Sequence, residues 1–510
     1  MSEITTLAAL LAVGQDDAVA LGAPGRPALT YQGLRTHVAQ TVTTLNRLGI
    51  GRNDRVAIVL PNGPQMASAF VAVGAGATTA PLNPAYRQPE FEFYLADLGA
   101  KALVVEQGST TPAVDVAAAL NIPVLDLVTS PDGPAGLFDL VPRTGAATGP
   151  AARKGGYAEA DDIALVLHTS GTTSRPKIVP LTHRNICASA YNVGHTLALT
   201  AADRCLNIMP LFHIHGLIAA VSASLRAGAS IICTPGFDAL QFYGWLDEAK
   251  PTWYTAVPTM HQAILARAGR NQEIIANTNL RLIRSSSSSL PKPVMQELEE
   301  TFRAPVIEAY GMTEAAHQMT SNPLPPQARK PGAVGLPAGP KVAIMDEQGN
   351  LLPANTIGEV VIQGPNVTLG YENNPKANAE NFTNGWFRTG DQGVIDDDGY
   401  LALTGRIKEI INRGGEKISP REVDDILMEH PAVQQVVTFA MPHEKLGEEV
   451  AAAVVLREGS DATERELRTF AATRLADFKV PRKILFLTEI PKGATGKLQR
   501  IGLAEKLGVG

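Results

Sequence analysis

The chain has 510 residues, of which 45% are hydrophobic and 18% are charged, and its 44 basic and 50 acidic side chains give a net charge of −6. This length exceeds what one hydrophobic core usually supports, so at least two domains are expected. The mild acidity argues against general binding to nucleic acid or to an anionic membrane, and no run of about 18 apolar residues predicts a membrane span.

The N-terminus and the cysteines indicate a cellular compartment. Residues 1–4 read Met-Ser-Glu-Ile, without the basic segment and long apolar stretch of a secretion signal. Cys187, Cys205 and Cys233 are widely spaced and form no metal-binding or Cys-x-x-Cys pattern. We therefore predict reduced, buried thiols in a cytoplasmic protein.

Helical and extended apolar segments alternate along the first half of the chain. Apolar residues recur at helical spacing over 34–48, and a second helix is predicted over 66–73. Buried strands are predicted for the short apolar runs at 56–60, 102–105, 163–167, 231–233 and 253–257. This alternation predicts an α/β fold whose large N-terminal domain has parallel or mixed sheets covered by helices. Residues 145–156, rich in Gly, Ala and Pro, are interpreted as a connector.

The C-terminal part of the chain has a different order of elements. Residues 419–422 (Ser-Pro-Arg-Glu) and 463–466 (Thr-Glu-Arg-Glu) have the pattern of capping boxes that open helices. Between them, the apolar runs 433–439 and 450–456 predict two strands. The order helix, strand, strand, helix predicts a small, compact α+β domain.

A polar loop follows the predicted strand 163–167. Residues 168–177 read His-Thr-Ser-Gly-Thr-Thr-Ser-Arg-Pro-Lys. Exposed N–H groups, hydroxyls and cations all bind phosphate oxygens, so the segment favours a phosphate site over a simple surface turn. The Walker pattern requires Gly-Lys-Ser/Thr, whereas Pro176, Lys177 and Ile178 stand here, so this is a different kind of loop.

The loop resembles the ATP-binding loop of the adenylate-forming enzymes, which include acyl-CoA synthetases, luciferases and the adenylation domains of peptide synthetases. Four further motifs follow in the order typical of that family, at 310–314 (Tyr-Gly-Met-Thr-Glu), 386–391 (Trp-Phe-Arg-Thr-Gly-Asp), 405–417 and 491–497. The resemblance implies a large AMP-binding domain over 1–405. It also implies a small mobile lid domain over 406–510, with a hinge near Lys408.

The resemblance also implies roles for individual residues. The residues implied to bind ATP or AMP are Thr169, Ser170, Gly171, Thr172, Thr173, Lys177, Tyr310, Thr313, Asp391 and Arg406. Catalysis is assigned to Lys177, Thr313 and the mobile Lys497, and Glu314 is expected to hold Mg²⁺ that bridges phosphate oxygens. The three aspartates at 396–398 lack calcium-loop spacing and instead predict a solvated hairpin turn.

The chemistry of this family needs no side-chain nucleophile. A carboxylate attacks the α-phosphorus of ATP, pyrophosphate leaves, and the thiol of coenzyme A then displaces AMP from the acyl-adenylate. The expected cofactors are ATP and Mg²⁺, with coenzyme A as co-substrate. The expected partners are a small carboxylic acid and coenzyme A, with no nucleic acid or membrane, and the expected state is a monomer or homodimer.

Polar groups expected near the acyl end of the site indicate which acid is activated: His213, His215, Arg284, 285–289 and His317. A long fatty chain needs an apolar tunnel, whereas a small acid with a second carboxylate would pair with such groups. The segments 168–177, 210–216 (Pro-Leu-Phe-His-Ile-His-Gly), 252–259 (Thr-Trp-Tyr-Thr-Ala-Val-Pro-Thr) and 312–317 (Met-Thr-Glu-Ala-Ala-His) resemble the oxalyl-CoA synthetase (oxalate–CoA ligase) subgroup. The resemblance to this subgroup implies that His213, Ser287 and His317 bind oxalate. His213 alternatively corresponds to the aromatic gate of the wider family.

Three alternatives stay open at this point. One is a CoA ligase for a medium-chain or aromatic acid. Another is an ATP-binding protein with impaired turnover, because Ile178 replaces a glycine of the family loop and would be strained if that position needs a positive φ. The third transfers the acyl group to a carrier protein, for which no carrier segment is visible.

Overall fold

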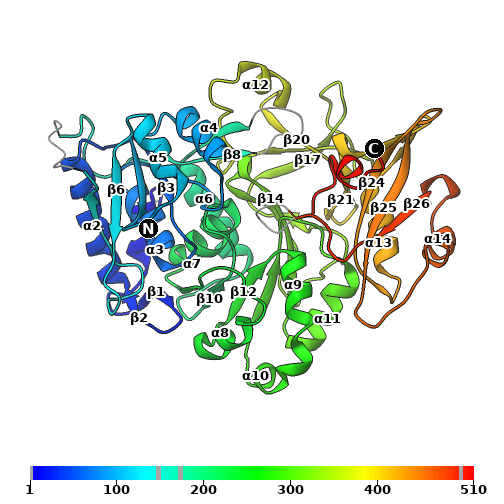
Figure 1. Cartoon of the computed structure of the whole chain (residues 1–510), viewed down its shortest axis with the longest axis horizontal. Helices are drawn as coiled ribbons and strands as arrows, with labels where there is room; N and C mark the ends of the chain where they lie inside the picture. The colour runs from blue at the N-terminus through cyan, green and yellow to red at the C-terminus, as the bar shows by residue number, and fades with distance from the viewer. Residues whose placement is uncertain (1–3, 145–150, 170–175, 493–497) are drawn as a thin grey trace.

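The computed structural model describes residues 4–144, 151–169, 176–492 and 498–510. Figure 1 shows a larger body that contains the N-terminus and, at the right, a smaller C-terminal body with β24, β25, β26, α13 and α14. Two large sheets form the centre of the larger body. Their inner strands are parallel, as the alternation of helices and apolar strands predicts.

The first large sheet has nine strands in the order β16-β15-β14-β13-β12-β10-β11-β1-β2. The strands from β14 to β1 pair in parallel, and the outer pairs are antiparallel. The strand bounds are β1 (Val19–Ala23), β2 (Arg26–Thr30), β10 (Arg204–Asn207), β11 (Ser230–Cys233), β12 (Trp253–Ala256), β13 (Leu282–Ser285), β14 (Val306–Met312), β15 (His317–Ser321) and β16 (Leu336–Pro337).

The second large sheet has seven strands in the order β7-β6-β5-β3-β4-β8-β9. Its inner pairs are parallel, and the pairs β6–β7 and β8–β9 are antiparallel. The bounds are β3 (Arg55–Val59), β4 (Thr78–Pro81), β5 (Ala102–Glu106), β6 (Val124–Val128), β7 (Asp139–Pro142), β8 (Ile163–Thr169) and β9 (Lys177–Thr182).

Helices lie between and around these sheets. α3 contacts β4 of one sheet and β1 and β11 of the other, and α6 contacts β8, β9 and β15. Because α3 lies between two sheets, all its residues except Gln65 are buried. The helix bounds are α1 (Leu7–Leu10), α2 (Tyr31–Arg47), α3 (Pro64–Gly74), α4 (Gln88–Leu98), α5 (Pro112–Ala119), α6 (His183–Thr196), α7 (Ala223–Arg226), α8 (Phe242–Ala249), α9 (Pro258–Leu265), α10 (Gln272–Ala276), α11 (Lys292–Phe302) and α12 (Pro375–Asn381).

A third, five-stranded sheet completes the larger body with β17 (Lys341–Met345), β18 (Gly358–Gln363), β19 (Phe382–Thr383), β20 (Trp386–Ile395) and β21 (Leu401–Arg406). The aspartates at 396–398 form the turn between β20 and β21, so the predicted hairpin is confirmed. Lys330 lies 2.6 Å from carboxylate oxygens of both Asp396 and Asp398. These carboxylates thus stabilise a turn.

The smaller body has its own five-stranded sheet, with β22 (Ile411–Arg413), β23 (Glu416–Ile418), β24 (Val433–His443), β25 (Gly447–Leu456) and β26 (Lys483–Phe486), and the helices α13 (Pro420–Met428), α14 (Glu464–Ala472) and α15 (Leu503–Lys506). The predicted α+β arrangement is confirmed. The capping box at Thr463 and Glu466 forms in full. The predicted box at Ser419 forms only by half, because Glu422 binds Lys479 instead of the Ser419 backbone.

The two bodies pack against each other through apolar residues of both, which form one continuous cluster. A hydrogen bond of 2.9 Å from Gln262 Nε2 of α9 to the Gln434 carbonyl of β24 adds to this contact. The chain passes from the third sheet to the fourth over residues 407–410, and Lys408 is exposed in the short 3₁₀ turn η5 (Ile407–Glu409). Arg406 is the last residue of β21 and so belongs to the larger body's sheet.

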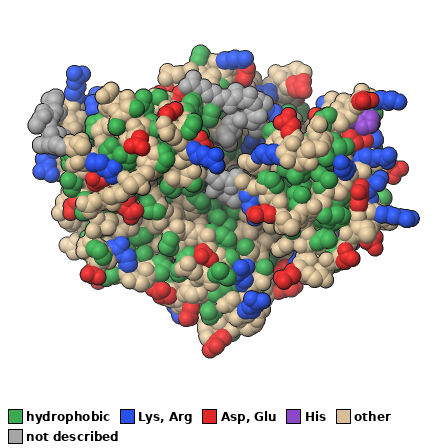
Figure 2. Space-filling view, viewed as in Figure 1, with side chains coloured by type: hydrophobic (Ala, Val, Ile, Leu, Met, Phe, Trp, Pro, Cys, Tyr) green, Lys and Arg blue, Asp and Glu red, His purple; other side chains and the backbone are tan. Residues whose placement is uncertain are grey.

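Acidic and basic side chains are interspersed over the face of the molecule in Figure 2, so its charge is not gathered into one patch there. Within the described ranges, no helix has the length and apolar character needed to cross a membrane. The three cysteines are free and buried, as predicted.

Candidate active site

The described ends of the polar loop lie in β8 and β9, where Thr169 pairs with Lys177 and His168 with Ile178. Ser170, Gly171, Thr172 and Thr173 lie outside the described residues. Ile178 is a buried residue of β9 and does not have a left-handed backbone. The conditional expectation of strain is therefore wrong for this structure, because an extended strand suits a β-branched side chain.

Lys177 and Glu314 are linked through Tyr371. The Lys177 ammonium lies 4.4 Å from the centroid of the Tyr371 ring, and the Tyr371 hydroxyl donates a 2.8 Å hydrogen bond to Glu314 Oε1. Burial raises the pKa of the Glu314 carboxyl, while the hydrogen bond from Tyr371 acts in the opposite direction. Tyr371 thus contacts a cation through its ring and a buried carboxylate through its hydroxyl, and it is a residue that the sequence patterns did not indicate.

Glu314 fits the kind of Mg²⁺ that arrives with a nucleotide. The described part of the chain contains no group of three or more His, Cys, Asp or Glu side chains that could hold a metal by themselves. Mg²⁺ bound with ATP needs only one or two carboxylates, since phosphate oxygens and water supply the other ligands. A single buried carboxylate beside a lysine meets that requirement.

The turn from β14 to β15 carries the motif Tyr-Gly-Met-Thr-Glu. Thr313 and Glu314 lie in its short 3₁₀ turn η4 (Thr313–Ala315), with Thr313 half-buried. A Cβ at Gly311 would lie 1.8 Å from the His317 carbonyl oxygen, so only glycine fits there. The turn is tight, and it places Thr313 and Glu314 directly between Tyr310 and His317 along the chain.

Tyr310, Asp391 and Arg406 form the Asp391 cluster. The buried Tyr310 hydroxyl donates to Asp391 Oδ2, and Arg406 Nε lies 3.0 Å from Asp391 Oδ1. Asp391 and Arg406 are paired in register on β20 and β21, which explains their proximity. The Asp391 side chain is 8% exposed, whereas that of Arg406 is 47% exposed. The structure thus brings three predicted nucleotide-binding residues together, and their role in binding stays a prediction.

His215, Arg284, Ser287 and His317 form the Arg284 cluster. Arg284 of β13 donates from Nη1 to His215 Nε2 at 3.3 Å and from Nη2 to His317 Nε2 at 3.1 Å. The two imidazoles stack with centroids 4.9 Å apart, and His215 Nδ1 lies 3.0 Å from Ser287 Oγ. Two predicted acid-binding residues, the half-buried Ser287 and the buried His317, therefore lie in one polar cluster.

The third predicted acid-binding residue, His213, occupies a different place. It is half-buried, and its Nδ1 accepts a 3.3 Å hydrogen bond from the His215 backbone N–H. His215, the first residue of the π-helix η2 (His215–Ser222), is the histidine that contacts Ser287. The segment 212–215 (Phe-His-Ile-His) contains both histidines. Which of them contacts Ser287 depends on where the helix begins.

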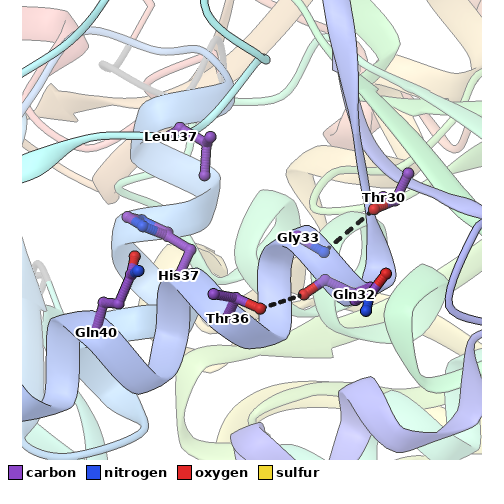
Figure 3. A pocket seen from close by; sticks show the side chains of 7 residues that line it. All are labelled: Thr30, Gln32, Gly33, Thr36, His37, Gln40 and Leu137. Carbon is purple, nitrogen blue, oxygen red and sulfur yellow. Dashed lines mark hydrogen bonds between the residues drawn. The ribbon is translucent and has the colours of Figure 1, made fainter.

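Two further predicted residues belong to the C-terminal part of the chain. Lys497 lies outside the described residues, and Lys408 is exposed between the two bodies. Figure 3 shows a hollow along α2 that is lined by none of the predicted site residues. Burial lowers the pKa of His37 in this hollow to about 4, and Thr30 and Thr36 are hydrogen-bonded within their own segment.

Three neighbouring features thus line the β14–β15 turn: a tyrosine–aspartate–arginine cluster, a lysine and carboxylate suited to phosphate and Mg²⁺, and a buried arginine with two histidines. The chain belongs to the AMP-binding enzyme family. Residues 11–372 match the AMP-binding enzyme domain, and residues 422–497 match the AMP-binding enzyme C-terminal domain.

Curated relatives share most of the chain's length. Oxalate–CoA ligase of Arabidopsis thaliana is 46% identical over 489 residues, which cover 95% of this chain and 94% of the relative. Oxalate–CoA ligase of Saccharomyces cerevisiae is 44% identical over 475 residues, which cover 89% and 87%. The crystal structure of ATP-bound MatB from Rhodopseudomonas palustris has a TM-score of 0.87 at 30% identity and covers 99% of each chain.

Proposed function

We propose that the protein is an ATP-dependent acid–thiol ligase that joins oxalate to coenzyme A through oxalyl-adenylate. The 46% identity with an oxalate–CoA ligase over 95% of the chain supports this proposal. The observation that carries it is the buried cation of Arg284 beside Ser287 and two histidines, one of which, His317, follows Thr313 and Glu314 on the same turn. A polar, cationic site suits a small diacid and would leave an apolar acyl chain against unpaired polar groups.

The reaction has two steps that balance without a covalent enzyme intermediate. One carboxylate oxygen of oxalate attacks the α-phosphorus of ATP, the bond to the bridging oxygen breaks, and pyrophosphate leaves. The sulfur of coenzyme A then attacks the acyl carbon, its proton is lost to solvent, and AMP leaves. In the first step, anions meet at one centre, so cationic and hydroxyl groups must stabilise the developing charge.

The chain's own residues would divide this task. In our proposal, Tyr310 stacks on the adenine, Asp391 accepts hydrogen bonds from the ribose hydroxyls, and Arg406 contacts the nucleotide. Lys177 and Thr313, with the hydroxyls of Thr169, Ser170, Thr172 and Thr173 and the backbone at Gly171, bind phosphate oxygens. Mg²⁺ held at Glu314 would neutralise charge on those oxygens when it is bound.

We further propose that the chain acts as a body and a lid that rotate about Lys408, divided near the predicted boundary between 1–405 and 406–510, with Arg406 kept on the body by its pairing with Asp391. The chain changes sheet at 407–410, and Lys408 is exposed there, which supports a hinge at this point. Rotation would bring Lys497 to the phosphate and carboxylate for the first step and remove it for the second.

A catalytically impaired ATP-binding protein is the weaker candidate. It depended on a strained loop at Ile178, and Ile178 lies in regular extended backbone in β9. The buried free cysteines agree with the proposed cytoplasmic location, and a monomer or homodimer remains part of the proposal.

Pyrophosphate release tests the function directly. Purified protein with ATP and Mg²⁺ should release pyrophosphate with oxalate, and oxalyl-CoA should form only when coenzyme A is added. Octanoate and benzoate serve as comparison acids, because each has one carboxylate on an apolar group. Faster pyrophosphate release with octanoate or benzoate than with oxalate would refute the choice of acid, and ATP binding without turnover of any acid would refute the enzyme.

The two half-reactions test the lid. Lys497→Ala should abolish adenylate formation, while preformed oxalyl-adenylate should still react with coenzyme A, because only the first step needs the extra cation. Lys492→Ala is the matched control, since Lys492 lies in the same motif but pairs with Glu489 at 3.0 Å. Equal loss of both half-reactions in Lys497→Ala would refute the division of roles.

A further inference from the structure

Arg284 is a fully buried cation without a balancing carboxylate. It is 0% exposed, and none of the carboxylates in the described residues forms an ion pair with it. Burial lowers the pKa of its guanidinium to about 9, which still leaves it charged at neutral pH. An uncompensated buried charge is costly, so a site that retains one is suited to an anionic ligand.

The acceptors around Arg284 are all neutral and have fixed orientations. Besides the two imidazoles, Thr255 Oγ1 lies 3.5 Å from Nη1 and Gln318 Oε1 lies 3.4 Å from Nη2. The Gln318 amide cannot turn around without loss, because its Nε2 donates to Thr196 Oγ1 at 3.1 Å and to the Ala338 carbonyl at 3.3 Å. The side chains around Arg284 therefore accept hydrogen bonds from its guanidinium but contribute no negative charge to balance it.

Both histidines face Arg284 through Nε2. The guanidinium lies 3.3 Å from His215 Nε2 and 3.1 Å from His317 Nε2, and Thr255 Oγ1 lies 2.7 Å from His215 Nε2. His215 Nδ1 lies 3.0 Å from Ser287 Oγ, so both ring nitrogens of His215 contact polar side chains. The two rings stack on each other beside the Arg284 guanidinium, with centroids 4.9 Å apart.

The backbone around the cluster is strained at the same positions. Ser287 has φ of 73°, Ala316 of 46° and His317 of 99°, all in the left-handed region that disfavours side chains. Such strain persists only where the surrounding structure holds it, and it concentrates at binding sites. The left-handed backbone at Ser287 and His317 thus sets the positions of both side chains.

We propose that Arg284 is a positioning and specificity-determining residue, whose fixed charge and hydrogen bonds to His215 and His317 make the site select a small dianionic acid. This inference rests on the proposed function and adds the feature of the acid that is recognised. That feature is the negative charge of a second acidic group attached directly to the carboxylate that is activated. A monoanion of the same shape would leave the charge of Arg284 unbalanced.

Oxamate supplies the necessary probe, because it has the shape of oxalate with a neutral amide in place of one carboxylate. Pyrophosphate release with both acids gives kcat and KM for each. We expect the wild-type kcat/KM to favour oxalate by roughly 100-fold or more, and Arg284→Gln to reduce that preference to below roughly 10-fold, mainly through KM for oxalate. A purely structural arginine would lower kcat/KM for both acids by the same factor.

A neighbouring arginine provides the matched control. Arg281 pairs with Asp203 at 3.0 Å, away from the Arg284 cluster, so Arg281→Gln should keep the wild-type preference. If Arg284→Gln does not fold, Arg284→Lys takes its place. Arg284→Lys keeps the positive charge but cannot form the bidentate contacts of a guanidinium. It should lower the preference for oxalate over oxamate to an intermediate value.

The outcomes separate this inference from the proposed function. Wild-type protein that releases pyrophosphate with neither acid refutes the function itself. Wild-type protein that prefers oxalate, combined with an unchanged preference in Arg284→Gln, overturns the inference and leaves the function intact. An equal loss on both acids in Arg284→Gln, or in Arg284→Lys where that variant is used, also overturns the inference.

Discussion

The Asp391 cluster and the Arg284 cluster both contain an arginine, but their charges are balanced differently. In the Asp391 cluster, Arg406 is nearly half exposed and pairs with a buried carboxylate that also accepts from Tyr310. In the Arg284 cluster, the arginine is fully buried and pairs with no carboxylate of the described residues. The first cluster is electrostatically complete by itself, whereas the second has a charge that its own residues leave unbalanced.

This difference indicates what each cluster can bind. A carboxylate already paired with an arginine can still accept hydrogen bonds from neutral hydroxyls, as a ribose would offer. A buried cation surrounded by neutral groups gains most from an anion, because the charge interaction is strong where water is excluded. The comparison leads to three predictions about stability and binding.

The largest effect is expected for Asp391→Ala. The buried Tyr310 hydroxyl would lose its acceptor, and Arg406 would lose its ion pair. We expect the KM for ATP to rise by about 10- to 100-fold and the free energy of unfolding to fall by about 2–3 kcal/mol, mostly from the unsatisfied hydroxyl, since exposed ion pairs contribute little. Initial rates and urea unfolding measure the two quantities.

Asp398→Ala is the control for that prediction. Asp398 lies in the turn between the same two strands, but its side chain is 73% exposed. Its removal should change the free energy of unfolding by less than about 0.5 kcal/mol. An unchanged KM for ATP in Asp391→Ala would contradict the assignment of the Asp391 cluster to the nucleotide.

A buried carboxyl on the neighbouring strand gives the second prediction. Glu308 of β14 pairs in register with Ser285, one residue from Arg284, so it lies on the opposite face of the sheet. Its Oε1 accepts from the Leu290 N–H at 3.0 Å. Burial raises its pKa from 4.5 to about 7, against smaller lowering effects of Arg421 and of the Leu290 hydrogen bond. Unlike an arginine, this acid can become neutral by taking up a proton.

The sign of the pH effect follows from this raised pKa. Between pH 4.5 and about 7, the folded state binds the Glu308 proton more tightly than the unfolded state, so stability falls as the pH rises. Glu308→Gln should match the wild type near pH 4.5 and exceed its free energy of unfolding by about 2 kcal/mol at pH 8. Urea unfolding across this range measures the difference, and Glu489→Gln, at an exposed carboxylate, is the control. A wild-type stability that rises over this window would contradict the prediction.

The smallest effect on stability is expected for Arg284→Met in the ligand-free protein. The substitution removes a costly buried charge, but it leaves His317 and Gln318 acceptors without their arginine donor. These contributions oppose each other, so the free energy of unfolding should change by less than about 1 kcal/mol. A loss of more than about 3 kcal/mol in urea unfolding would mean that Arg284 is held mainly for stability.

Local patterns in the sequence predicted the elements and the order of the motifs well. Helix α2, strands β3 and β5 and the capping box at Thr463 depend on periodicity or on residues three positions apart, which a linear pattern contains. The capping box at Ser419 failed in part because Lys479, a residue 57 positions away, binds Glu422. Ile178 was misjudged because its backbone conformation depends on pairing with β8.

The sequence by itself determined the α/β pattern, the separate C-terminal α+β unit and the run of motifs, because each depends on neighbouring residues. Only the tertiary structure decided that His215 contacts Ser287, that Tyr371 links Lys177 to Glu314, and that no described carboxylate balances Arg284. The physical reason is that charge balance and hydrogen bonding depend on which side chains meet across different strands. These side-chain contacts are set by the packing of the sheets, and a linear sequence pattern does not contain them.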